Sequence, residues 1–449
     1  MQAPDAGAGP ASFLTPLGYQ TSSCGYCKQD DTSASYYVKC RTLDVAHYQA
    51  LIDRGWRRSG TLLYKPDVRR ACCPHYTIRL PAASFKPTRD QRQAVNRWNR
   101  YVLGDSYMND AKRLYPKTKE EKARQRNGFD LCEVIHEAEY TNIKRPPEPA
   151  HRFEVTLEPD SFTEEKFQLF SNYQQAVHHE QPHEVTREGF RRFLCDSPLT
   201  RRTADGSSTC LGSFHQCYRL DGRLIAIAVL DLLPHAVSGV YFIYHSDFEK
   251  YSFGKISALR ETALAKEFGL QFYYMGYYIH NCVKMRYKGD YHPQYVLDPE
   301  SYEWNMLDGE MRELLDENKY VSLSRRKEQE AQVPACGGDA AMQDVGLTPD
   351  IEGKYLDSPS LAVSAVDEGL SLLELGVPGV MGPEELVEQV NLDRIKIAIP
   401  RAGLIANMED LVTWDKGAVT DKSSLKGYIA EMAACVGPEV AREMVVQLN

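Results

Sequence analysis

The stretch "SFHQCYRLDGRLIAIAVLDLLPHAVSGVYFIYH", residues 213–245, decides the fold prediction. Its first two runs, 213–220 and 223–233, have the pattern of strands, and Asp221-Gly222 between them favours a two-residue hairpin turn. The run "GVYFIYH" (239–245) predicts a third strand. The sequence therefore predicts an antiparallel meander near the middle of the chain.

Further elements are expected on both sides of this meander. Upstream, "HRFEVTLE" (151–158) alternates with period two, as a half-buried strand does. A capping box at Ser161 and Glu164 then predicts a helix start, and "REGFRRFLCDSPL" (187–199) predicts a second, short helix. The first helix carries apolar residues at helical spacing: Phe167, Phe170, Tyr173 and Val177.

Downstream, "SALRETALAKEF" (257–268) predicts an amphipathic helix, and "LQFYYMGYY" (270–278) predicts a last strand. The order of strand, two helices, meander, helix and strand indicates an α+β fold with helices on the faces of a sheet. Among common folds it fits the acetyltransferase-like (GNAT) arrangement best.

Composition divides the chain into four expected parts. Residues 1–20 are Pro- and Gly-rich and are expected to be a disordered tail. Residues 21–145 form an N-terminal unit with four notable cysteines and a basic loop, and the three prolines of "IKRPPEPAHR" (143–152) mark its end. Residues 146–325 hold the α+β unit. Residues 326–449 form an acidic region with helix-like pieces and no catalytic pattern.

The charges are unevenly distributed along the chain. The net charge is −9, but residues 327–449 alone carry −12, whereas residues 86–126 carry +7. The basic stretch also contains four aromatic residues, Trp98, Tyr101, Tyr107 and Tyr115. Basic residues interleaved with aromatic ones suit nucleic acid, although a solvated helix or mobile loop has the same composition.

The sequence also bears on where the chain works. It has no run of about 18 apolar residues, and its first 19 residues lack the basic and apolar regions of a signal peptide. We therefore expect a cytoplasmic protein, which could also enter the nucleus. Thiols stay reduced there, so close cysteine pairs favour metal or redox sites over disulfides.

Two such pairs lie in the N-terminal unit: Cys24 and Cys27 in "CGYC", and Cys72 and Cys73 in "CCPH". A Cys-x-x-Cys turn lets two thiolates bind one metal. Adjacent cysteines converge poorly on one tetrahedral ion and could more easily serve separate irons of an iron–sulfur cluster. Zinc stays open, with His47 or His75 replacing one thiolate. The alternatives are a buried structural cysteine and a redox pair.

Several blocks together resemble eukaryotic arginyl-tRNA–protein transferases. In the family's order, from residue 24 to about 297, they are "CGYC", "GWRRSG" with "YK", "CCPHYTIR", "RFLCDSPL", "LIAIAVLDLLP", "VYFIYH", "GKISALRE" and "YYMGYYIHNCVKMRYKGDYHP". The resemblance implies an aminoacyltransferase that moves arginine from charged tRNA to proteins beginning with Asp, Glu or oxidised Cys, marking them for degradation. It also implies that Cys24, Cys27, Cys72 and Cys73 are associated with iron–sulfur binding, and it supports the GNAT-like fold.

The implied reaction is aminolysis of an ester, in which a neutral α-amine attacks the aminoacyl carbonyl. It needs positioning and oxyanion stabilisation more than a covalent intermediate. Asp231, a carboxylate at the end of an apolar strand, is the first candidate partner for the arginine side chain, and Glu261 is the second. A strand-end cap and a solvated helix carboxylate are the respective structural alternatives.

Cations are expected to hold the acidic acceptor or a tRNA phosphate. Lys255, Ser257 and Arg260 lie near a helix start, where backbone N–H groups favour anions. The segment "SFGKIS" (252–257) occupies the place where acetyltransferases cradle pyrophosphate but lacks their Gly-rich pattern. We therefore expect no acetyl-CoA, and no nicotinamide cofactor.

The tRNA end and the proton transfers need further groups. Tyr241, Tyr277 and Tyr278 could stack on the terminal adenine or donate to the oxyanion, while His215 and His280 are candidate proton acceptors. Lys284, Arg286 and Lys288 follow the last strand, and with the loop 112–126 they form an expected tRNA track. Each of these tyrosines and histidines has a structural alternative in the core.

Two other functions remain open on the sequence alone. A non-catalytic iron–sulfur or zinc protein could bind RNA through the same basic segments. An ordinary acyl-CoA acetyltransferase is a second alternative, which the absence of the Gly-rich pattern disfavours.

Overall fold

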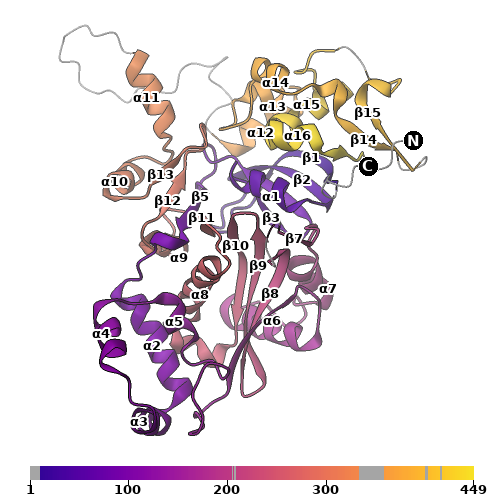
Figure 1. Cartoon of the computed structure of the whole chain (residues 1–449). Coiled ribbons are helices and arrows are strands. Elements are labelled where there is room, and N and C mark those ends of the chain that lie inside the picture. Colours follow the sequence, from indigo (N-terminus) through magenta and orange to yellow (C-terminus); the bar gives the residue numbers. More distant parts are fainter. Residues whose placement is uncertain are drawn as a thin grey trace, which may run out of the picture.

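The computed structural model describes residues 11–204, 206, 209–332, 358–399, 403–414 and 417–448, and within 124–127 only the backbone. Two sheets organise this part of the chain (Figure 1). None of its helices is both long and apolar enough to cross a membrane.

The central sheet carries the expected meander. Its main path runs β13-β12-β5-β11-β10-β9-β8-β6, and β7 pairs with β8 beside this path. The strands are β5 (Tyr76–Pro81), β6 (Phe153–Pro159), β7 (Arg202–Thr203), β8 (Cys210–Leu220), β9 (Arg223–Leu233), β10 (Ala236–Tyr244), β11 (Phe272–Tyr278), β12 (Tyr295–Leu297) and β13 (Trp304–Met306). The meander β8-β9-β10 and the strands on either side of it are thus confirmed.

The turn between β8 and β9 has the predicted chemistry. Asp221 and Gly222 both have positive φ, 53° and 83°. A two-residue hairpin turn with both central residues in this region matches the right-handed twist of the strands. Every residue of β9 after Arg223 is buried, because helices cover both faces of the strand.

Helices α6 (Glu164–Val177) and α8 (Phe253–Glu267) pack on opposite faces of the central sheet. Ile227 and Val229 of β9 belong to the apolar cluster of α6, whereas Ala228 and Leu230 belong to the larger core that includes α8. The predicted capping box of α6 is wrong: the N-cap is Thr163, whose hydroxyl accepts from the backbone N–H of Lys166. The helix therefore starts two residues later than the Ser161 signal indicates.

The basic segment and the residues just after it fold into helices, and the first and last of these contact α8. They are α2 (Arg89–Leu103), α3 (Asp105–Leu114), α4 (Lys119–Asn127) and α5 (Leu131–His136). The expected loop 112–126 is corrected, because its residues form the end of α3 and most of α4. A Thr118 cap on Glu121 starts α4, a local signal within a charged run.

The second sheet joins the two ends of the chain. Its order is β15-β14-β16-β1-β2-β4-β3, so strands from residues 13–66 and 396–446 share one ladder. The strands are β1 (Phe13–Ser22), β2 (Ser33–Thr42), β3 (Arg57–Ser59), β4 (Leu62–Pro66), β14 (Lys396–Ile399), β15 (Leu404–Asn407) and β16 (Val445–Val446). The tail expected over 1–20 is corrected from Phe13 onward, and residues 1–10 lie outside the described part.

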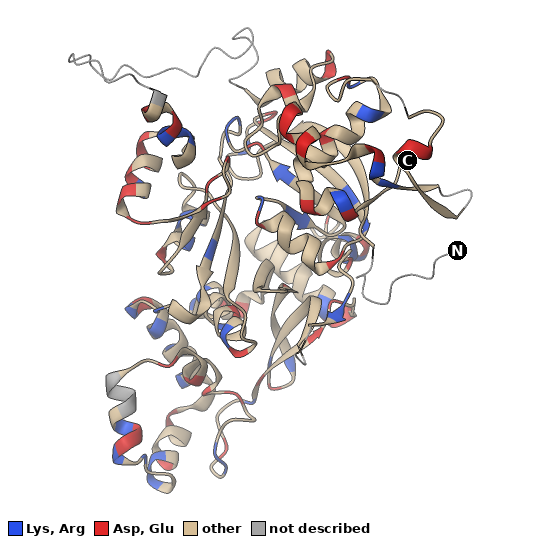
Figure 2. Cartoon of the chain, turned by 45° about the horizontal axis from the view of Figure 1, so that its top comes forward, with Lys and Arg blue, Asp and Glu red and all other residues tan. Residues whose placement is uncertain are grey.

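The acidic C-terminal segment covers this second sheet. Helices α12 (Pro359–Asp367), α15 (Leu425–Val436) and α16 (Pro438–Glu443) lie over β1, β2 and α1 (Val45–Ile52). Figure 2 shows Asp and Glu positions, in red, along the ribbon of the C-terminal segment. The sheets thus connect segments that the sequence analysis placed in different units, while the expected domain boundaries stay a prediction.

Candidate functional site

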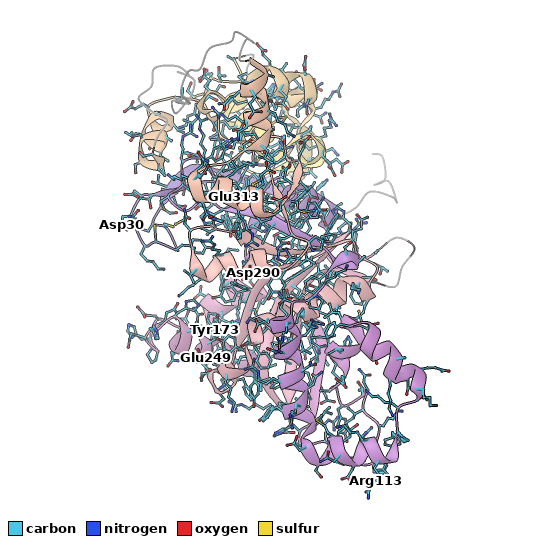
Figure 3. The ribbon with its side chains drawn as sticks, turned by 90° about the vertical axis from the view of Figure 1, so that its left-hand side faces the viewer. Asp30, Arg113, Tyr173, Glu249, Asp290 and Glu313 are labelled. Atoms are coloured by element: carbon cyan, nitrogen blue, oxygen red, sulfur yellow. The ribbon has the colours of Figure 1, made fainter. Side chains whose placement is uncertain are left out.

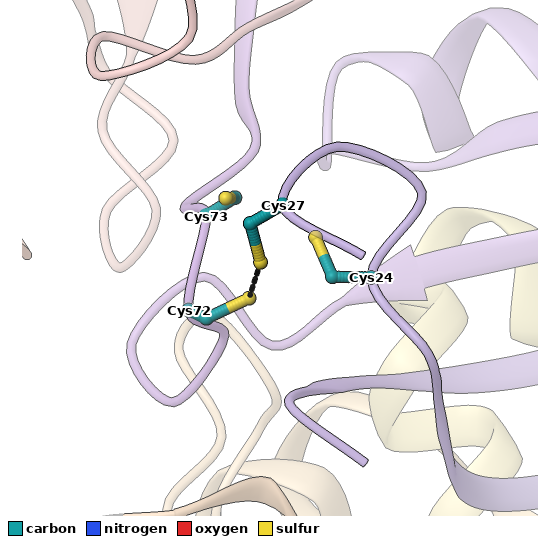
Figure 4. A group of neighbouring side chains, drawn as sticks. All are labelled: Cys24, Cys27, Cys72 and Cys73. Atoms are coloured by element: carbon teal, nitrogen blue, oxygen red, sulfur yellow. Dashed lines mark hydrogen bonds between the residues drawn. The ribbon is translucent and has the colours of Figure 1, made fainter. Parts of the chain in front are cut away.

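The four cysteines meet between two loops of the N-terminal unit. Cys24 and Cys27 lie in the β1–β2 loop, and Cys72 and Cys73 lie between β4 and β5. Their sulfurs all lie within 4.8 Å of one another, and the Cys27 and Cys72 sulfurs are 3.3 Å apart (Figure 4). A hydrogen bond from the Cys72 N–H to the Thr32 carbonyl oxygen, 2.9 Å, ties the two loops together.

This donor set fits a metal. Four thiolates with bonds of about 2.3 Å around one tetrahedral ion lie about 3.8 Å apart, which is close to the observed spacing. The adjacent pair therefore does converge with Cys24 and Cys27, contrary to the expectation from its spacing in sequence. A hydrogen bond from the Gln29 backbone lowers the pKa of the Cys27 thiol to about 7, which favours the thiolate that a metal needs.

The two histidines considered as substitute ligands lie elsewhere. His47 contacts Ser12 and Glu443. Burial lowers the pKa of His75 to about 4, and its ring lies between those of Tyr26 and Tyr277, with centroid distances of 5.2 and 5.3 Å. This aromatic series connects the cysteine loop to the end of β11, so the cysteine site lies beside the central sheet although it is distant in sequence.

Residues from distant segments of the chain lie on one side of the molecule. Figure 3 shows Asp30 of the cysteine loop, Asp290 after α9 (Val283–Arg286) and Tyr173 of α6 on one side of the molecule. Tyr26 of the cysteine loop and Tyr287 just after α9 are 38% and 41% exposed. Partly exposed aromatic rings of this kind suit stacking on unpaired bases.

Asp231 lies at the junction of the two sheets, in a buried ion pair with Arg58 of β3. The guanidinium donates to both carboxylate oxygens, at 2.7 and 2.6 Å, and also to the Ser213 hydroxyl at 3.0 Å. Both side chains are almost fully buried. Arg58 thus already pairs with the carboxylate that the sequence analysis proposed as a partner for the arginine side chain of the substrate. That role of Asp231 stays a prediction.

The other catalytic candidates are spread over the central sheet. His215 is buried, contacts the Leu194 carbonyl oxygen through Nε2 at 2.8 Å, and has a pKa lowered by burial to about 4. Tyr241 is half-buried, 3.1 Å from Nε2 of His178. The Tyr278 hydroxyl lies 2.7 Å from Nδ1 of His280, whose Nε2 lies 2.7 Å from Asp316. The structure does not bring His215 and Tyr278 together in one hydrogen-bonded group.

The candidates on α8 have protein partners. Lys255 pairs with Asp90, Ser257 donates to Glu261, and Arg260 pairs with Glu139. Arg260 is buried and also donates to the Ile135 carbonyl oxygen at 2.6 Å, so it links α8 to α5. Their substrate contacts therefore stay predictions.

The candidates after β11 fall into two groups. Lys284 and Arg286 are exposed on α9, where Arg286 lies 3.3 Å from Asp316. Lys288 is half-buried, and its ammonium donates to the Met275 and Tyr277 carbonyl oxygens at 2.8 and 3.1 Å. The Tyr277 hydroxyl donates to the Gly55 carbonyl oxygen at 2.9 Å.

Two buried charged groups near Lys288 were underrated by sequence reasoning. Glu261 accepts from Ser257 and from the Tyr273 hydroxyl at 2.6 Å, and burial raises its pKa to about 7. Arg57 is buried over the Tyr277 ring, 5.3 Å from its centroid. Its Nε and Nη2 have no hydrogen-bond partner among the described residues. The sequence signal for Arg57 was its place beside Arg58 in a strand-like run. Neighbouring residues of a strand point to opposite faces, so one of two consecutive arginines is buried where the strand packs against a second sheet.

Family comparisons match both parts of this arrangement. Residues 22–93 match the model "Arginine-tRNA-protein transferase, N terminus", and residues 165–298 match the corresponding C-terminus model. The first range contains the four cysteines, and the second contains the central meander, α8 and Lys288.

Named relatives extend over much of the chain. Arginyl-tRNA–protein transferase 1 of Arabidopsis thaliana is 28% identical over 71% of this chain and 77% of its own. The Saccharomyces cerevisiae protein of that name is 34% identical over 57% and 50%. An aspartate/glutamate leucyltransferase of Pseudomonas fluorescens is 31% identical over 61% and 89%.

Among solved structures, L-PGS from Bacillus licheniformis matches 46% of this chain and 45% of its own, with 9% identity and a TM-score of 0.25. That score is too low to support a fold assignment. The two family models, together with relatives of the same name from plants and fungi, show that the chain belongs to the arginyl-tRNA–protein transferase family.

Proposed function

We propose that this protein transfers arginine from arginyl-tRNA to the N-terminal α-amine of proteins beginning with Asp, Glu or oxidised Cys, which marks them for degradation. The proposal of transferase activity rests on the match of both family models. The acidic acceptor is supported by bacterial relatives that are named for aspartate and glutamate.

The tRNA would lie across the basic elements of the central half. Lys284 and Arg286 on α9 are exposed cations, and α3 and α4 carry further basic residues. Local positive surfaces hold RNA even on a chain of negative net charge, because the ionic contacts are short-ranged at physiological salt.

The acidic side chain of the acceptor needs a cation that is not already neutralised. Lys255 and Arg260 both pair with carboxylates, whereas Arg57 has two guanidinium nitrogens without partners among the described residues. A buried, unpaired charge is costly unless a ligand compensates it. We therefore favour Arg57 over Lys255 and Arg260 for this contact.

The chemistry requires an α-amine to reach the ester carbon in its neutral form. An α-amine has a pKa of about 8, so Glu261, with its pKa near 7, has a suitable affinity for the released proton. His215 is less suitable, because its pKa of about 4 lies far below that of the amine.

The four cysteines would hold a zinc ion or an iron–sulfur cluster, and their spacing favours a single ion. Either group would lock the β1–β2 loop against the segment before β5. We also propose the acetyltransferase-like arrangement for the central sheet. The parallel pairing of β10 with β11 over only three residues supports it.

Transfer of labelled arginine from charged tRNA to two peptides tests the function. One peptide begins with Asp, and the other carries the same Asp behind a Met. We expect label on the first peptide alone. Label on neither, with tRNA still bound after anaerobic preparation, would contradict the proposal and indicate an RNA-binding protein without transferase activity.

A further inference from the structure

The parallel strands β10 and β11 separate after a short contact. They pair at Ala236–Phe272, Val237–Tyr273 and Ser238–Tyr274. A bulge between Gly239 and Tyr241 then interrupts β10, and β11 shifts register against β5 between Tyr274 and Tyr277. Beyond these points the two strands form no ladder hydrogen bonds with each other. A buried carbonyl group there needs another hydrogen-bond donor.

Lys288 supplies that donor. Its ammonium binds the carbonyl oxygens of Met275 and Tyr277 on β11. Gly276 lies between the two acceptor residues with φ of 80°, a backbone conformation that favours glycine. An ammonium has three N–H donors, and these two carbonyls are its only hydrogen-bond acceptors among the described residues. One N–H is therefore uncommitted.

The positive charge of Lys288 also has no hydrogen-bonded carboxylate among the described residues. The charged and titratable groups around it are Arg57 from β3, Glu261 from α8 and Cys282 before α9. Burial and the Arg57 charge lower the pKa of Lys288 to about 8. Glu261 forms its hydrogen bonds with Ser257 and Tyr273 instead, so no described carboxylate is hydrogen-bonded to the ammonium.

We propose that Lys288 donates its remaining N–H to the carbonyl oxygen of the aminoacyl ester and stabilises the oxyanion formed during transfer. This inference rests on the proposed function. The amine nitrogen bonds to the carbonyl carbon, and the bond from that carbon to the ribose oxygen breaks. One proton leaves the nitrogen and one ends on the ribose oxygen, while Lys288 keeps its own protons.

The position of Lys288 favours the ester over a phosphate of the tRNA. Its ammonium is held by two backbone carbonyls of β11, which fixes its direction before substrate arrives. Oriented donors in a water-poor site stabilise a developing charge well because they need no reorganisation. Lys284 and Arg286, by contrast, are exposed on α9, as phosphate contacts usually are.

Single-turnover transfer with Lys288→Met and Lys288→Arg tests the proposal. For Lys288→Met we expect the rate constant at saturating tRNA to fall by about 10²- to 10³-fold, with the dissociation constant of arginyl-tRNA changed less than threefold. Lys250→Met is the matched control, because Lys250 is exposed and has no place among the proposed tRNA and ester contacts, and it should change neither the rate constant nor the dissociation constant.

The pH profile separates charge donation from a structural role. The ammonium loses its proton as pH rises through about 8, so the wild-type rate should fall on the alkaline side. Lys288→Arg keeps its charge and its carbonyl contacts, so its rate should not fall there. This variant also guards against misfolding of Lys288→Met, which leaves two carbonyls unpaired.

Three results would overturn the proposal. The first is a Lys288→Met rate within threefold of wild type. The second is a loss of rate matched by the loss of tRNA affinity, which would indicate a phosphate contact. The third is a Lys288→Arg profile with an unchanged alkaline limb. A wild-type chain that transfers no arginine would overturn the proposed function as well.

Discussion

At the scale of single residues, Arg58 and Asp231 hold the two sheets together. Their side chains are 2% and 0% exposed, and two short hydrogen bonds join them. Asp231 ends an apolar strand because it meets this partner, which the run "LIAIAVLDLL" alone does not reveal. The contribution of Asp231 to stability can be measured separately from any contact that Asp231 makes with substrate.

We expect Asp231→Asn to lower the free energy of unfolding by about 3 to 5 kcal/mol, because it leaves the Arg58 charge buried without a counter-charge. Urea denaturation measures this change. The double variant Arg58→Met with Asp231→Leu should recover most of the loss. Unchanged stability with lost arginine transfer would instead assign Asp231 to substrate binding.

The cysteine site makes a second prediction at this scale. We expect Cys24→Ser to lose bound metal while the central sheet stays folded, because the four thiolates lie outside that sheet. Elemental analysis of anaerobically purified protein, with circular dichroism, measures both properties.

Cys210→Ser is the matched control, since Cys210 is exposed and lies outside the four-sulfur group. Full metal content in Cys24→Ser would show that the other three cysteines suffice or that the metal binds elsewhere.

At the scale of elements, a charged network ties α5 to α8. His136 contacts Glu139 and Glu267, both at 2.8 Å, and Arg260 pairs with the same Glu139. Hydrogen bonds to the two carboxylates raise the pKa of His136 to about 9. The helix α5, which also contacts α2, is therefore attached to α8 through a histidine whose pKa lies above neutral pH.

This attachment should depend on pH. Because the folded-state pKa of His136 exceeds the unfolded value of about 6.5, its contribution is complete below pH 6.5 and is lost as pH rises through about 9. We expect the wild type to be more stable than His136→Gln at pH 6, and the difference to vanish by pH 10. Denaturant unfolding at both values measures it, and an equal difference at both would contradict the assignment.

At the scale of the whole molecule, the C-terminal segment completes the unit that carries the cysteines. Val445 and Val446 of β16 pair with Phe13 and Leu14 of β1. The Arg70 guanidinium, near the second cysteine pair, donates to the Leu375 carbonyl oxygen at 2.7 Å. The acidic C-terminal region, which has no catalytic pattern, therefore packs against the unit that carries the cysteine loops and stabilises it.

We expect Val446→Asp to lower the free energy of unfolding by more than about 3 kcal/mol, because it buries an unpaired carboxylate in the second sheet. Its metal content should fall with the unfolding of the cysteine loops. Thermal melting and elemental analysis measure the two effects. Val412→Asp, at a fully exposed position of the same segment, should change neither, and equal effects of the two variants would contradict this account.

The local pattern of the sequence determined much of the central sheet. Alternation predicted β6, the Asp221-Gly222 turn predicted the β8–β9 hairpin, and helical spacing predicted α6 and α8. These features succeed because each depends on residues within a few positions of one another. The cysteine pairs were recognisable for the same reason, since ligand spacing is a local property.

Only the tertiary structure decided which distant groups meet. The pairing of Leu14 with Val446, the partner of Asp231 and the convergence of Cys72 and Cys73 with Cys24 all depend on contacts across long stretches of chain. Lys288 belongs with them, because its two acceptors lie on β11, beyond the residues that pair with β10. Local periodicity carries no record of such contacts, which packing and the satisfaction of buried polar groups select in the folded chain.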